Sequence, residues 1–138
     1  MNRMYQISKD FPWSASHVLN GLHDDHPCGR LHGHNYVARV TIEAATLDEN
    51  GFVVDYGRLA PFKAYIDEVL DHRHLNDVTD ENPTAEHLAD MLTAVAGTCV
   101  HGQRDVTMYV TVAVSETPKT WARGLPLTVD PAAHQEDA

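Results

Sequence analysis

Strict alternation of apolar and polar side chains is the feature that most limits how this chain can fold. Over residues 32–44, every second position from Tyr36 to Ala44 is apolar, and the positions between are mostly polar. Residues 106–114 repeat this pattern, with valines and one methionine on the apolar positions. A period of two is typical of a β-strand with one buried face. These segments therefore predict a sheet that a second layer must cover.

The region between these two strands carries two predicted helices. From Pro61, apolar residues recur at spacings of three and four as far as Leu70, which indicates an amphipathic helix ending close to Asp71. A second helix is predicted from Thr84, a favourable N-cap, to Gly97.

Two more strands complete the expected architecture. Residues 3–11 alternate in the same way and are expected to end at Pro12, and residues 120–129 are expected to form a last strand. The order of elements, ββααββ, predicts an α+β fold with an antiparallel four-stranded sheet and both helices on one face. Such a sheet has two open edges, which association of subunits would cover.

Composition limits the class of protein. With 138 residues, 43% hydrophobic and 22% charged, the chain predicts one domain over residues 1–129 and a disordered tail over 130–138. The net charge of -10 disfavours binding to phosphate backbones and to acidic membranes, so no nucleic-acid or membrane partner is expected. The sequence has no run of about 18 apolar residues and no apolar N-terminal segment, which favours a cytoplasmic protein.

Histidine is the unusual component, because five of the ten histidines fall between positions 17 and 34. His32 and His34 share the parity of the apolar strand face, so both imidazoles are expected there. With His17 from the preceding strand, they could supply the three protein ligands of a catalytic zinc site. The alternative is that they are surface or hydrogen-bonded core histidines. His23 and His26, in the intervening loop, are expected to be solvated; the alternative is that one of them supports the site without binding the metal.

Four other residues could carry acid–base or binding chemistry, and each has an alternative. Cys28 precedes His32 by four residues, where a nearby cation would favour a basic thiolate. The motif alone leaves open a fourth zinc ligand in a closed structural site, although such a site would need no second acid–base group. Asp71 could fix the tautomer of His72 for proton transfer, or the two could simply end a helix. Glu116 continues the apolar parity of its strand and could accept two N–H bonds from an amidine-like edge, as in a pterin, or face water.

The motifs of this chain stand in a specific order: Phe11–His17, Cys28–Tyr36, Gly51–Tyr56, Leu70–Asn76, Glu81–Glu86 and Glu116–Pro118. In this order they resemble the 6-pyruvoyl-tetrahydropterin synthase family, which includes the 6-carboxytetrahydropterin synthases. The likeness runs from about Tyr5 to about Ala122, nearly the whole chain. Residues 119–124 are unlike the commoner ending of the family.

The resemblance implies a role for each residue of the site. The residues implied to bind zinc, Zn2+, are His17, His32 and His34. Those implied to transfer protons are Cys28, as the base, and the pair Asp71 and His72. Those implied to bind substrate are Glu116, as the anchor of the pterin ring, and Thr84. The candidates for binding the substrate triphosphate are Arg30, Lys119 and Arg123.

The resemblance also implies an assembly. It predicts the tunnelling fold, in which subunits join their sheets into a barrel. The expected homo-oligomer is a hexamer of two trimers with active sites between subunits.

The spacing of Cys28 and His32 favours one branch of the family. Three residues separate them, as in the 6-carboxytetrahydropterin synthases of queuosine-type 7-deazapurine pathways, whereas the pyruvoyl enzymes typically have a longer gap. The implied reaction converts 7,8-dihydroneopterin triphosphate to 6-carboxytetrahydropterin, acetaldehyde and triphosphate. The alternatives are a 6-pyruvoyl-tetrahydropterin synthase and a non-catalytic zinc- or pterin-binding protein on the same fold.

Overall fold

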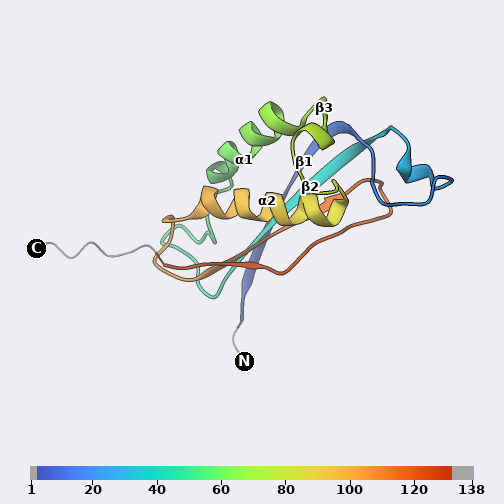
Figure 1. The fold of residues 1–138 in the computed structure, drawn as a ribbon. Helices are drawn as coiled ribbons and strands as arrows, with labels where there is room; N and C mark the ends of the chain where they lie inside the picture. Colours follow the sequence, from blue (N-terminus) through green and yellow to red (C-terminus); the bar gives the residue numbers. More distant parts are fainter. Residues whose placement is uncertain (1–2, 132–138) are drawn as a thin grey trace, which may run out of the picture.

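A computed structural model describes residues 3–131 and has the expected α+β fold (Figure 1). Its five strands are β1 (Tyr5–His17), β2 (His32–Ala44), β3 (Arg73–His74), β4 (Met108–Ser115) and β5 (Leu127–Val129). They form one sheet in the order β3-β1-β2-β4-β5. The neighbours are antiparallel except β3, which runs parallel to β1. The expected four-stranded antiparallel sheet is therefore corrected to a five-stranded mixed sheet.

Strand β1 continues through Pro12, where the sequence predicted its end. The register pairs β1 with β2 along its whole length, from Tyr5 opposite Ala44 to His17 opposite His32. Proline is tolerated because β3 pairs only with Ala15 and Ser16, so β1 has no strand partner at Pro12 on that side. The additional six residues bring His17 into the sheet.

Two helical segments cover one face of the sheet, as expected (Figure 1). The first starts as a 3-10 turn, Tyr56–Leu59, continues as α1 (Ala60–Tyr65) and ends in a π-helical turn, Ile66–Leu70. The second is α2 (Ala85–Val100), and the hydroxyl of Thr84 accepts a hydrogen bond from the His87 amide at 3.2 Å, which confirms the predicted N-cap.

Helix α2 passes through Gly97, so the predicted stop at this glycine is wrong. A Cβ atom at Gly97 would lie 2.4 Å from Cδ2 of Leu127, and glycine therefore lets β5 pack closely on the helix.

The core lies between the helices and the apolar face of β1, β2 and β4. Phe62 and Leu92 from the helices, and Val40, Ile42 and Val112 from the strands, are all 0% exposed. Burial of this kind is the main force that fixes the register of the strands. That register in turn fixes which side chains meet at the His17 end of the sheet.

The segment after β4 differs from its prediction. Residues 120–129 form a bridge between Val114 and Ala122 and then β5, rather than one continuous strand. From residue 132 onward, the predicted tail lies outside the described residues. No helix within residues 3–131 is long and apolar enough to cross a membrane.

Candidate metal centre and active site

Three histidines meet at one end of the sheet, because the register of β1 and β2 brings them together. His17 is opposite His32, and Ala15 is opposite His34, so the three imidazoles share the helix-covered face. Their possible ligand atoms all lie within 4.8 Å of one another. His17 is fully buried, and the other two are half-buried. The structure thus brings together the three predicted zinc ligands.

Backbone carbonyls assign the tautomers of two of these histidines. Nδ1 of His17 lies 2.8 Å from the carbonyl oxygen of Pro83, and Nδ1 of His32 lies 2.7 Å from that of Arg30. A carbonyl only accepts, so both Nδ1 atoms carry protons and both Nε2 atoms carry lone pairs.

These Nε2 atoms face each other at 2.9 Å. Two lone pairs at this distance repel unless a cation or proton lies between them, so the donor set fits a metal ion.

Burial favours the uncharged form of two of these histidines. It lowers the pKa of His17 and of His34, although the carboxylate of Glu116 opposes the effect at both. Nε2 of His34 is buried and has no hydrogen-bond partner within the part of the chain that the structure describes. Neutral imidazoles with free Nε2 atoms are the form in which histidine binds metals.

Glu116 reaches the cluster from the end of β4, as its parity in the sequence predicts. Its Oε2 atom lies 3.9 Å from Nε2 of His34, and its side chain is 24% exposed. A carboxylate in this position can also accept hydrogen bonds from a ligand that enters beside the histidines.

Cys28 is close to His32 in the sequence, but it lies outside the cluster of ligand atoms. It is half-buried in a 3-10 turn, Pro27–Gly29, and its thiol is not one of the mutually close donors found within residues 3–131. The expected alternative, a fourth metal ligand, therefore gains no support from the geometry.

Asp71 and His72 form the expected pair, on the β3 side of β1. Asp71 Oδ1 lies 3.0 Å from Nδ1 of His72 and accepts the amide of Ser14 at 3.0 Å. The Ser14 amide, followed by His72, lowers the pKa of the Asp71 carboxyl. The His72 side chain is 82% exposed, so its imidazole is oriented but open to solvent. No hydrogen bond or ion pair among the described residues joins this pair to Cys28 or to the three histidines.

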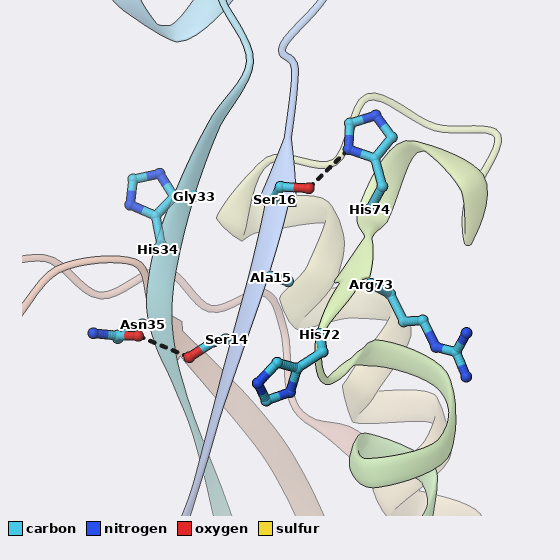
Figure 2. A pocket seen from close by; sticks show the side chains of 9 residues that line it. All are labelled: Ser14, Ala15, Ser16, Gly33, His34, Asn35, His72, Arg73 and His74. Atoms are coloured by element: carbon cyan, nitrogen blue, oxygen red, sulfur yellow. Dashed lines mark hydrogen bonds between the residues drawn. The ribbon is translucent and has the colours of Figure 1, made fainter.

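His72 lines a cavity of about 500 Å³ beside the cluster (Figure 2). The cavity is formed by residues 14–16 of β1, 33–35 of β2 and 72–74. His74, for which the sequence predicted no role, lies in this cavity with its Nδ1 3.0 Å from Oγ of Ser16. Figure 2 shows His34 extending from β2, with His72 and His74 beyond β1.

Several supporting residues were missed by sequence reasoning. The Tyr36 hydroxyl lies 3.2 Å from Nδ1 of His17, and burial raises the pKa of this phenol. Asn76 holds the backbone of Val18 through two 2.8 Å hydrogen bonds. Asn76 lies in a short 3-10 turn, Leu75–Asp77, which carries no periodic signal, so only the folded chain reveals this contact. Thr84 caps α2, and its predicted contact with substrate stays a prediction.

Comparisons with known proteins agree with the family resemblance. The model of the 6-pyruvoyl tetrahydropterin synthase family matches residues 6–124. A Synechocystis protein named 6-carboxy-5,6,7,8-tetrahydropterin synthase is 38% identical over 95 residues, covering 62% of this chain and 70% of that protein. A Bacillus subtilis protein of the same name is 28% identical over 124 residues, covering 85% and 82%.

The fold also matches a solved structure. The 6-pyruvoyl tetrahydropterin synthase of Caenorhabditis elegans superimposes with a TM-score of 0.70 at 21% identity, covering 89% of this chain and 96% of that one. The family model spans most of the chain, and the three histidines of the resemblance meet in the fold. This chain belongs to the 6-pyruvoyl tetrahydropterin synthase family.

Proposed function

We propose that this chain is a zinc-dependent 6-carboxytetrahydropterin synthase. The observation that carries the proposal is the convergence of His17, His32 and His34, with Glu116 beside them. Two further features favour this branch: the short spacing between Cys28 and His32, and the names of the Synechocystis and Bacillus subtilis relatives. The proposed substrate is 7,8-dihydroneopterin triphosphate, and the product would feed queuosine or another 7-deazapurine.

The proposed mechanism divides binding and proton transfer among named side chains. The three histidines would hold Zn2+ through their Nε2 atoms. Bound there, the ion would lower the pKa of the side-chain hydroxyls of the substrate. Glu116 accepts N–H bonds from the pterin ring and fixes its position relative to the histidines.

Proton transfer is assigned to two separate groups. The Cys28 thiolate removes a proton from the carbon beside the substrate hydroxyls. His72, whose Nδ1 is held by Asp71, returns protons through its exposed Nε2. Cleavage of a carbon–carbon bond in the substrate side chain would give the carboxy product. Loss of triphosphate without that cleavage would give the pyruvoyl product.

We further propose that the active site is shared between subunits, in a hexamer of two trimers that joins sheets into a barrel. The support is the exposure of His72 and the absence of any hydrogen bond from it to Cys28 within residues 3–131. A mixing experiment tests this. Cys28→Ala and His72→Ala variants, each inactive, are dissociated, mixed and reassembled. A shared site predicts recovered activity in the mixture, whereas a site within one chain predicts none.

Product analysis tests the reaction itself. Zinc-loaded protein is incubated with 7,8-dihydroneopterin triphosphate, the pterin product is identified by mass, and acetaldehyde is assayed. Carboxytetrahydropterin with acetaldehyde supports the proposal. A pyruvoyl product would instead indicate a 6-pyruvoyl-tetrahydropterin synthase that uses the same site residues. A Pyrococcus furiosus relative, 37% identical over 59 residues, is named dihydroneopterin monophosphate aldolase, so the monophosphate is included as a second substrate.

One variant separates an enzyme from a binding protein on the same fold. Cys28→Ala removes the proposed base but leaves all three histidines in place. Unchanged zinc content with lost turnover supports the enzyme. Unchanged turnover would remove Cys28 from the mechanism.

A further inference from the structure

The turn that carries Cys28 is capped by a histidine side chain. The backbone amide of Cys28 donates a 3.1 Å hydrogen bond to Nδ1 of His26, and the amide of Gly29 donates to the His26 carbonyl at 3.0 Å. His26 has extended backbone angles, φ −74° and ψ 127°, as an N-cap residue does. Histidine here performs the function that asparagine, aspartate or serine usually performs.

This cap is the one side-chain hydrogen bond of the turn among the described residues. Besides the bond from Gly29, its backbone hydrogen bonds run from the Arg30 amide to the Pro27 carbonyl at 3.2 Å and from the Leu19 amide to the Cys28 carbonyl at 3.0 Å. A three-residue 3-10 turn has little intrinsic stability, so one side-chain bond changes its population substantially.

The turn is also joined to the metal centre. The carbonyl of Arg30, immediately after the turn, accepts the hydrogen bond from Nδ1 of His32. Leu19, on its other side, is two residues beyond His17. The position of the Cys28 backbone therefore determines where its thiol lies relative to the three histidines.

We propose that His26 is a positioning residue for Cys28. Its neutral imidazole, with the proton on Nε2 and the lone pair on Nδ1, closes the Pro27–Gly29 turn and thereby places the thiol. The inference rests on the proposed catalytic role of Cys28. Within residues 3–131, the hydrogen bonds of His26 join it to His23, Cys28 and Gly29 and not to the cluster, so we assign its effect to the backbone of the turn.

Two substitutions and a matched control test this proposal in the zinc-loaded full-length protein. His26→Ala removes the acceptor, and His26→Asn restores one, because an asparagine side chain accepts from the amide two residues on. His23→Ala is the control, since His23 is exposed in the same loop and its side chain makes no hydrogen bond within residues 3–131.

Two readouts are measured on each variant. Amide hydrogen exchange follows the protection of the Cys28 amide, and steady-state kinetics gives kcat and KM separately. In His26→Ala, loss of the cap is expected to lower the protection of the Cys28 amide about fivefold and to lower kcat by a similar factor. KM and zinc content should stay within about twofold of the wild type, because binding groups are untouched. His26→Asn and His23→Ala should resemble the wild type in both readouts.

The outcomes separate this inference from the proposed function. Wild-type kcat or wild-type exchange in His26→Ala overturns the inference, as does failure of His26→Asn to restore both. If Cys28→Ala retains turnover, the proposed function of Cys28 fails instead. In that case the exchange measurement still decides whether His26 holds the turn.

Discussion

Acid should destabilise the metal-free protein through its buried histidines. Burial lowers the pKa of His17 and His34 below the ordinary value of 6.5. Below that pH the unfolded chain binds protons that the folded chain does not, so the free energy of unfolding falls with decreasing pH. The loss begins as pH falls through about 6.5 and continues until the lowered pKa values of the folded state are reached.

The expected slope follows from the number of buried groups. One histidine that titrates only in the unfolded chain contributes at most about 1.4 kcal/mol per pH unit. His17 is fully buried and should contribute more than His34, which keeps 19% side-chain exposure so that solvent screens its charge. The lowered pKa of Asp71 acts in the same direction but only at lower pH, outside this window.

Urea unfolding at pH 7.5, 6.5 and 5.5, after metal removal, measures this slope. His17→Gln should flatten it below pH 6.5, because glutamine does not titrate. His101→Gln, which changes an exposed histidine outside the cluster, is the control and should keep the wild-type slope. An unchanged slope in His17→Gln would refute the assignment of the acid sensitivity to the buried cluster.

Three other perturbations address the metal, the substrate anchor and the core. Zinc at about a hundred times its Kd should raise the free energy of unfolding by about 2.7 kcal/mol at pH 7.5, and His32→Ala should abolish this gain in thermal unfolding. Glu116→Gln should raise KM about tenfold or more with zinc content unchanged, because a charged acceptor is lost; an unchanged KM would argue against the pterin anchor. Phe62→Ala should cost about 3–5 kcal/mol in urea unfolding, because its fully buried ring packs edge-on against Phe11 at 4.9 Å. A cost below about 1 kcal/mol would contradict that packing.

The fold was predictable where packing follows a simple period. Alternation in residues 32–44 and 106–114 predicted β2 and β4 closely, and helical spacing predicted α2. Strand β3 was missed because two residues carry no alternation. The end of α2 was wrongly predicted at Gly97 because the sequence does not reveal that Leu127 packs against this glycine. Local rules therefore failed where a distant segment decided the structure.

The metal centre was more predictable than its surroundings. Parity placed His32 and His34 on one face, and the register added His17, although the sequence predicted that β1 would stop before it. The carbonyls of Pro83 and Arg30, which assign the imidazole tautomers, come from backbone geometry that residue identity does not encode. His26 was expected to be solvated, and its acceptor role depends on the conformation of a three-residue turn.

The backbone of His72 adds a physical reason for a shared site. It has a φ of 60°, the one non-glycine residue with positive φ among residues 3–131. This conformation is uncommon for histidine, and the 2.6 Å bond from its amide to the Ser14 carbonyl helps to hold it. A left-handed residue commonly follows the last turn of a helix, so this φ also fits a helix end. In this conformation the imidazole is 82% exposed while Asp71 fixes its ring. An oriented acid–base group that points outward is suited to act on a ligand held by another subunit, which the mixing experiment tests directly.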